Sequence, residues 1–374
     1  MLPYGHHWID EDDIKAVCDV LRSDFITQGS KVSEFEEKVA AYCDTKYAVA
    51  VSSGTAGLQL ACKVAGVGKG DEVITTPLTF VASASSIIHC GGIPVFADIN
   101  PDTFNIDIKE MKRQWTPNKK FILPVDFAGH PVDLDQIMIF ARNRGLIVIE
   151  DACHALGAEY KGERIGSIAD MTVFSLHPVK HITTAEGGLV LTNNEVYYQK
   201  LKTLRHHGII KQNPSSWYYE IPQIGYNFRL TDVQCALGIS QLKKLDGFVA
   251  RRRDIVNKYN ETFKKISEIT IPYESPDVKH AYHIYIIQLC SELVTKRDSI
   301  IDDLRHNNIG ATVHYTPLHL QPYFQHKFGY KHGDYPKTET YYERAITLPL
   351  FAKMTNEDVN YVIESVKKVI RKYV

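Results

Sequence analysis

The chain has 374 residues, of which 44% are hydrophobic, and its 43 lysine and arginine residues nearly balance its 44 aspartate and glutamate residues. This length allows one large domain or two medium ones with a sizeable core, and the formal net charge of −1 argues against a nucleic-acid-binding protein, which needs a basic face. No apolar run approaches the roughly 18 residues that cross a membrane, and the first residues do not have the pattern of a signal peptide. The cysteines are scattered and form no C-x-x-C pair, which predicts reduced thiols in a cytoplasmic protein.

Strand and helix patterns alternate through the first 245 or so residues. Residues 10–22 begin with Asp10 and place apolar side chains three and four positions apart, which predicts an amphipathic helix. Short apolar runs predict strands at 47–52, 72–76, 93–98, 121–126, 146–150, 171–176 and 188–192, and helical spacers lie near 55–66, 82–90 and 134–144. Because strands covered on both faces are apolar throughout, we predict an α/β domain with a mostly parallel seven-stranded sheet.

The rest of the chain predicts a second, smaller domain. A long helical pattern at 231–264, interrupted near Gly247, leads into it. We therefore expect a large domain over 1–245 and a smaller α+β domain over 246–374. Beyond the long helical pattern, the predicted elements are a strand at 282–289, a helix at 295–308, a strand at 311–315 and a closing helix at 355–373.

Residues suited to ligand binding follow three of the predicted strands, and ligands of open parallel sheets bind beyond the carboxyl ends of the strands. The small residues 53–57 precede a helix and suit a phosphate, although many α/β turns have this composition. Phe80 is either ordinary core or a flat support for an aromatic ring. Asp151 is either a helix cap or a carboxylate that pairs with a protonated ring nitrogen.

The stretch FSLHPVKHITTAEGG, residues 174–188, continues from a fourth strand. Ser175 and Lys180 could hold a phosphate and an aldehyde there, whereas a lysine without this context is ordinarily exposed and inert. The four strand ends together suit pyridoxal phosphate (PLP) better than a nucleotide, because no glycine-rich nucleotide motif follows a strand. No spacing of histidine, cysteine and carboxylate residues indicates a metal.

Eight stretches occur in the order and spacing of a known family: FITQGSKVSEFEE, VSSGTAGLQL, TTPLTFVASASSI, IEDACHALGAEY, FSLHPVKHITTAEGG, GYNFRLTDVQCALG, ATVHYTPLHLQPYF and AITLPLF. Through them the chain resembles the PLP-dependent sugar-nucleotide aminotransferases of the DegT/DnrJ/EryC1/StrS family over nearly its whole length. The resemblance implies an aspartate-aminotransferase-like PLP-dependent transferase fold. It also implies PLP, or its amino form pyridoxamine phosphate (PMP), as the cofactor.

The resemblance also implies a role for each matching residue. Lys180 matches the catalytic lysine that holds the PLP aldehyde, and Asp151 matches the catalytic carboxylate that pairs with the pyridine nitrogen. The other implied cofactor contacts are Phe80 stacked on the ring, His154 near its hydroxyl, and Gly54, Thr55, Ala56, Ser175 and the neighbouring subunit's Asn227 at the phosphate. Implied substrate contacts are Tyr4, Asp24, Phe25, Ile26, Thr27, His314, Tyr315, Thr316 and Pro317. A phosphate contact from a neighbouring subunit implies a homodimer with shared active sites.

Within the family, LRHHGI, FSLHPVKHITTAEGG and GYNFRLTDVQCALGISQLKK are most similar to transaminases of pseudaminic acid synthesis. This match implies transfer of an amino group from L-glutamate to C4 of UDP-linked 4-keto-6-deoxy-N-acetyl-β-L-altrosamine. The alternatives are another nucleotide ketosugar such as UDP-4-keto-6-deoxy-D-GlcNAc, a PLP-dependent sugar dehydratase, in which histidine replaces the reactive lysine, and a non-catalytic regulator or sugar-binding member. The sequence assigns no role to His177 and His181, which flank the lysine.

Overall fold

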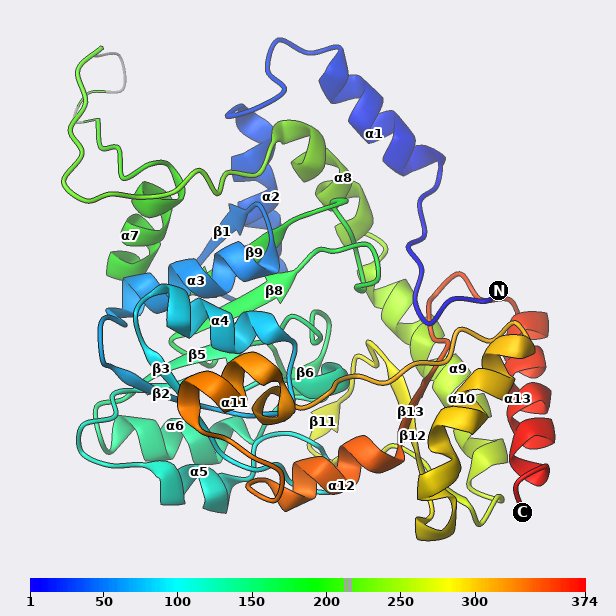
Figure 1. Ribbon diagram of the computed structural model, residues 1–374. Helices are drawn as coiled ribbons and strands as arrows, with labels where there is room; N and C mark the ends of the chain where they lie inside the picture. The colour runs from blue at the N-terminus through cyan, green and yellow to red at the C-terminus, as the bar shows by residue number, and fades with distance from the viewer. Residues whose placement is uncertain (212, 214–216) are drawn as a thin grey trace.

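A computed structural model of the chain describes residues 1–211, 213 and 217–374. Figure 1 shows a central sheet between layers of helices, with a second group of strands and helices, from the C-terminal part of the chain, packed beside it. The N-terminus lies with this second group, because Leu2 pairs with Ile309 in a β-bridge. The first residues of the chain therefore run past the C-terminal group before they reach the sheet.

The central sheet has seven strands in the order β1-β9-β8-β5-β4-β2-β3. They are β1 (Tyr47–Val51), β2 (Glu72–Thr75), β3 (Ile93–Phe96), β4 (Phe121–Ile122), β5 (Ile147–Asp151), β8 (Met171–Ser175) and β9 (Gly188–Thr192). β9 is antiparallel to both of its neighbours, and the other neighbouring strands are parallel. The predicted, mostly parallel seven-stranded sheet is confirmed.

Alternate side chains of β1, β2, β4, β5, β8 and β9 enter two separate apolar clusters, one on each face of the sheet. In β8, Phe174 belongs to one cluster and Val173 to the other. Successive side chains of a strand point to opposite faces of the sheet. Because both faces are covered by apolar clusters, the strands need apolar side chains on both faces. The helices packed around the sheet are α1 (Glu11–Leu21), α2 (Ser30–Tyr42), α3 (Gly54–Ala65), α4 (Val81–His89), α5 (Ile108–Gln114), α6 (Leu134–Arg142), α7 (Glu195–Arg205) and α8 (Asp232–Leu242).

The C-terminal group has its own apolar core. A three-stranded antiparallel sheet, in the order β10-β12-β13, forms its centre. The elements of this part are α9 (Leu245–Phe263), β10 (Ile269–Thr270), β12 (Tyr285–Leu289), η2 (Ser291–Lys296), α10 (Arg297–His306), η3 (Leu318–Leu320), α11 (Pro322–Phe328), α12 (Pro336–Arg344), β13 (Ala345–Leu348) and α13 (Asn356–Arg371). Short strands β6 (Glu159–Tyr160), β7 (Glu163–Arg164) and β11 (Val278–Lys279) form a third sheet, and η1 (Phe127–Gly129) follows β4.

Three predicted elements differ from the structure. The helical pattern at 231–264 is two helices, α8 and α9, separated at Lys243 and Lys244. The strand predicted at 121–126 ends after two residues, because Pro124 has no N–H to donate to a neighbouring strand. The strand predicted at 311–315 is wrong: this segment has a single bridge, between Thr312 and Thr347, and then turns toward the edge of the central sheet.

Among the described residues, no helix combines the length and apolar character that a membrane crossing requires. The predicted helices at 10–22, 295–308 and 355–373 correspond to α1, α10 and α13. Asp10 begins α1 as expected, since its side chain accepts hydrogen bonds from the N–H groups of Asp12 and Asp13. The division into domains at residue 245 stays a prediction, and α9 begins at that position.

Candidate active site

Four strands of the central sheet end at one edge, where a cavity of about 440 Å³ opens. β1 and β8 run in the same direction because each is antiparallel to β9, and β8 is parallel to β5. The predicted site residues that line this cavity are Tyr4, Gly54, Thr55, Phe80, Asp151, His154, Ser175, Lys180, His314 and Tyr315. Residues from distant parts of the chain thus meet at one place, as parallel strands require.

The first turn of α3 faces the cavity with free backbone donors. The Ser53 side chain caps the helix and accepts the N–H of Ala56 at 3.0 Å, which leaves the N–H groups of Gly54 and Thr55 without intrahelical partners. A Cβ atom on Gly54 would lie 3.0 Å from the Cβ of Ser175, so glycine allows the close approach of α3 to β8. The positive end of the helix dipole makes this turn suitable for an anion.

Asp151, the last residue of β5, places a buried carboxylate at the cavity. Its Oδ2 accepts a hydrogen bond from the Ser83 hydroxyl at 2.6 Å, and its Oδ1 accepts the N–H of Cys153 at 3.2 Å. The Ser83 hydroxyl is itself 2.6 Å from that of Thr79. These neutral groups fix the direction of the carboxylate and leave its charge for a cationic group in the cavity.

Lys180 extends from the loop after β8 into the same cavity. Burial lowers the pKa of its amine to about 8, while the neighbouring Cys153 and Asp151 raise it and Arg252 lowers it. An amine with this pKa is neutral in a larger fraction of molecules at neutral pH than an exposed lysine. Lys180 is therefore suited to act as a nucleophile and a base.

Aromatic side chains form the remaining walls. The Nε2 atom of His154 lies 3.3 Å from the Tyr315 hydroxyl, and burial holds the pKa of His154 well below its ordinary value. Phe80 is 53% exposed, which is unusual for a large apolar side chain, and its ring centroid lies 5.8 Å from that of Tyr315. The Tyr4 ring contacts that of His314, with centroids 4.8 Å apart.

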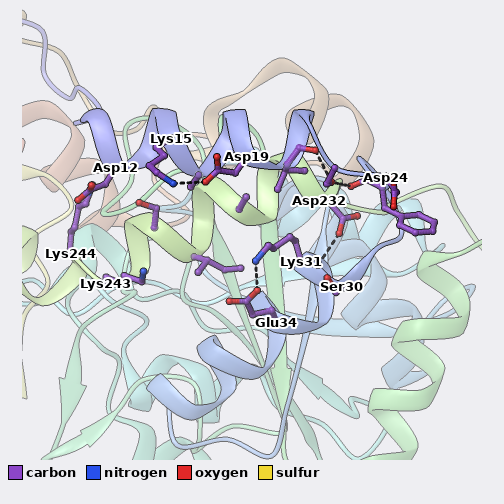
Figure 2. Close-up of a pocket in the computed structure, with 17 residues that line it drawn as sticks. Asp12, Lys15, Asp19, Asp24, Ser30, Lys31, Glu34, Asp232, Lys243 and Lys244 are labelled. Carbon is purple, nitrogen blue, oxygen red and sulfur yellow. Dashed lines mark hydrogen bonds and ion pairs between the residues drawn. The ribbon is translucent and has the colours of Figure 1, made fainter.

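The other predicted site residues lie outside this cavity: Asp24, Phe25, Ile26, Thr27, Ala56, Asn227, Thr316 and Pro317. Asp24 and Phe25 line a separate, open cavity of about 800 Å³ between α1, α2 and α8. Figure 2 shows side chains of both charges along this second cavity, with Lys15 paired to Asp19 and Lys31 to Glu34. The roles predicted for these residues stay predictions.

The comparisons with known proteins fit this geometry. The sequence model of the DegT/DnrJ/EryC1/StrS aminotransferase family matches residues 7–367. The chain belongs to this family. As a DegT-family aminotransferase it has the α/β fold that the motifs imply, and aminotransferases of this family depend on PLP.

Three relatives show how this DegT-family chain compares with others. It is 42% identical to the spore coat polysaccharide biosynthesis protein SpsC of Bacillus subtilis, over 99% of this chain and 97% of SpsC. It is 37% identical to the UDP-4-amino-4,6-dideoxy-N-acetyl-beta-L-altrosamine transaminase of Campylobacter jejuni, over 100% of this chain and 98% of that protein. The PMP form of Streptococcus pneumoniae Spr1654, assigned as a sugar aminotransferase, superimposes with a TM-score of 0.95 at 35% identity, covering 100% of both chains.

The sequence did not indicate several residues in and around this aminotransferase's cavity. Ser83, which orients Asp151, is one of several serines in ASASS, and no spacing distinguishes it from the others. His283, beside Lys180, precedes β12 and resembles any polar residue at the start of a strand. The two histidines near Lys180 lie in different places. His177 lines the cavity, and His181 is buried with its Nε2 atom 3.0 Å from the carbonyl oxygen of Ala281.

Two buried carboxyl groups lie behind Asp151. Asp126 and Glu150 are fully buried close to each other, and Thr172 donates to Glu150 at 2.7 Å. The Oδ2 atom of Asp126 and the Oε1 atom of Glu150 meet no hydrogen-bond donor among the described residues, so one carboxyl group has to carry a proton. Burial raises the pKa of Asp126 well above its ordinary value and that of Glu150 to about 7.

This pair predicts a pH dependence of the Asp126→Asn variant. Because the folded-state pKa values are raised, the stabilisation is complete below pH about 4 and is lost as the pH rises through about 7. An asparagine amide donates permanently to Glu150, so we expect the variant to gain about 1–3 kcal/mol relative to the parent chain between pH about 5 and 8. Denaturant unfolding of both chains across this range measures the difference, and parallel stability curves would contradict the shared proton.

Proposed function

We propose that this enzyme binds PLP on Lys180 and transfers an amino group from L-glutamate to C4 of a UDP-linked 4-keto-6-deoxy-N-acetylhexosamine. One observation supports the proposal most: Lys180, Asp151 and the free N–H groups of α3 surround a single cavity. An amine, a carboxylate and an anion site match the aldehyde, ring nitrogen and phosphate of PLP. We expect the enzyme to work in the cytoplasm, where nucleotide sugars are made.

The residues around the cavity fit this cofactor. We assign the phosphate to Gly54, Thr55 and the Ser175 hydroxyl, with Ala56 one residue further along α3. The exposed ring of Phe80 provides a stacking surface. The Nδ1 atom of His154 is buried without a hydrogen-bond partner among the described residues, and a ring hydroxyl beside it would satisfy that atom.

Bound PLP supplies an electron sink for the carbanion that forms when the amino donor loses its α-proton. Asp151 would hold a proton on the ring nitrogen through the negative charge of its carboxylate, whose orientation is fixed by the Ser83 hydroxyl and the N–H of Cys153. Lys180 would hold the aldehyde, and its amine would take the α-proton from the donor, since its pKa of about 8 keeps part of it neutral.

We also propose that two subunits share each site, with Asn227 reaching the phosphate in the partner's cavity. Asn227 lies on the surface and joins His206 in a β-bridge. The chain nearby exposes large apolar side chains, with Trp217 88% and Ile224 78% exposed. Exposed apolar groups of this size are typical of subunit interfaces. Asp24 to Thr27, with Phe25 65% exposed, would reach a substrate across the same interface.

For the sugar, we propose the β-L-altro configuration. The name of the Campylobacter jejuni relative supports this choice, and other ketosugars, including UDP-4-keto-6-deoxy-D-GlcNAc, are the main alternative. Tyr4, His314 and Tyr315 line the cavity beside the cofactor residues and are the proposed sugar contacts, with Thr316 and Pro317 next along the chain. A dehydratase is disfavoured, because Lys180 itself occupies the reactive position.

The substrate proposal predicts a preference that kinetics can measure. With glutamate as the donor, the enzyme is expected to aminate the L-altro ketosugar with a kcat/KM at least about tenfold above that of its D-gluco epimer, which corresponds to about 1.4 kcal/mol of differential binding. Coupled assays of both epimers give this ratio. The reverse preference would remove the L-altro assignment and leave the aminotransferase assignment standing.

A further inference from the structure

His283 lies against the reactive lysine and has no part in the assignments above. Its Nε2 atom is 3.4 Å from the Nζ atom of Lys180, and its side chain is 3% exposed and lines the cavity. Its other ring nitrogen, Nδ1, has no hydrogen-bond partner among the described residues. The polar contact of this imidazole is therefore directed at Lys180.

Arg252 of α9 hydrogen-bonds the backbone at this histidine. The arginine is 1% exposed, and its Nη1 atom donates to three backbone carbonyl oxygens. These acceptors are Tyr282 at 3.3 Å, His283 at 3.1 Å and Leu350 at 2.9 Å. The bonds tie the backbone just before β12 and just after β13 to one buried side chain, so the imidazole has a fixed place relative to the cavity.

We propose that His283 is a positioning residue that donates a hydrogen bond from its Nε2–H to the neutral amine of Lys180. In that arrangement Nδ1 is an unpaired acceptor. A charged ammonium group would force Nε2 to accept instead and would move the ring proton to Nδ1, where no acceptor lies. The ring thus favours the neutral lysine, the form that acts as nucleophile and base. The inference rests on the proposed function of Lys180.

Other charged or titratable groups also face this pair. They come from β5 and the residues after it, the loop after β8, α9 and the segment after α10: Asp151, Cys153, His154, His181, Arg252, His314 and Tyr315. Burial holds the pKa of His283 well below its ordinary value, and the charges of Lys180 and Arg252 lower it further. His283 is therefore a neutral ring at neutral pH, as the proposed hydrogen bond requires.

The test measures the apparent pKa of Lys180 in the cofactor-free protein. The protein is acetylated with trace acetic anhydride at a series of pH values, and mass spectrometry of the peptide that contains Lys180 gives the extent of acetylation at each pH. His283→Gln offers an amide oxygen that can accept from an ammonium group, and His283→Asn leaves room for water in the same place. We expect both changes to raise the apparent pKa of Lys180 by about one unit, which lowers the neutral fraction at neutral pH about tenfold. A pKa that is unchanged or lower would overturn the proposal.

His181→Gln is the matched control, because this buried histidine also lies near Lys180 but bonds the carbonyl oxygen of Ala281. It is expected to leave the lysine pKa unchanged, and an equal shift would overturn the specific role of His283. A measurement on the unaltered chain does not depend on whether the variants fold. In ¹⁵N NMR the ring proton of His283 should be found on Nε2, and a proton on Nδ1 would also overturn the proposal. PLP attachment is measured separately, so its failure would count against the proposed function while leaving this comparison intact.

Discussion

Lys180→Ala is expected to lower the rate of sugar amination by at least about 10⁴-fold, because one side chain serves as both the nucleophile and the proton-transfer base. The loss should appear in kcat, since the cavity walls that contact the substrate remain. Rates with glutamate and the ketosugar, measured for the variant and the parent enzyme, give this value. Retention of more than about one per cent of the parent kcat would remove Lys180 from the centre of the chemistry.

Lys119→Ala is the matched control for this variant. Lys119 is a buried lysine, with 8% exposure, whose amine binds the carbonyl oxygen of Gln114 and pairs with Glu72, outside the cavity. Its replacement is expected to lower stability and to leave kcat and PLP binding unchanged. A similar loss of activity in both variants would show that the effect of Lys180→Ala comes from unfolding.

Asp151→Asn is expected to lower kcat/KM by about 10²- to 10³-fold, or about 3–4 kcal/mol, because an amide cannot hold the proton on the ring nitrogen by its charge. The asparagine oxygen can still accept the N–H of Cys153, and its amide N–H can donate to the Ser83 hydroxyl, so the fold should be kept. Kinetics and the dissociation constant for PLP measure the change. An effect below about threefold would mean that the ring nitrogen lies elsewhere.

Asp98→Asn provides the comparison for Asp151→Asn. Asp98 is also a buried aspartate, and it accepts hydrogen bonds from the backbone of Ile99, Lys337 and Thr338 instead of facing the cavity. The variant is expected to be less stable but to bind PLP normally. A loss of PLP affinity in this variant as well would point to a general effect of removing a buried charge.

The sequence was sufficient to predict which strand ends meet. Runs such as YAVAV and MTVFS carry apolar residues on both faces, which identifies strands covered on both sides, and the parallel arrangement then brings Gly54, Asp151 and Lys180 to one edge. The antiparallel position of β9 between β1 and β8 could not be predicted, because a short apolar run carries no information about its direction. That insertion leaves β1 and β8 parallel, so the ends of these two strands still meet at one edge of the sheet.

Residues that act on the site from a distance could not be predicted. Ser83 meets Asp151 across 68 positions and His283 meets Lys180 across 103, and no local pattern encodes such contacts. The segment at 311–315 has the alternation of a strand, yet tertiary contacts determine its path: the Nδ1 atom of His314 lies 2.9 Å from the Thr347 hydroxyl, and the Tyr341 hydroxyl donates to the carbonyl oxygen of His314. The same contacts hold His314 and Tyr315 at the cavity.

The most direct test of the central claim is to locate PLP on the chain. Purified protein is incubated with PLP and treated with borohydride, which makes a bond between PLP and a lysine permanent, and its peptides are then examined by mass spectrometry. The account predicts a pyridoxyl group on Lys180, and its disappearance when glutamate is added before the borohydride. A label on a different lysine, or none on Lys180, would contradict the account.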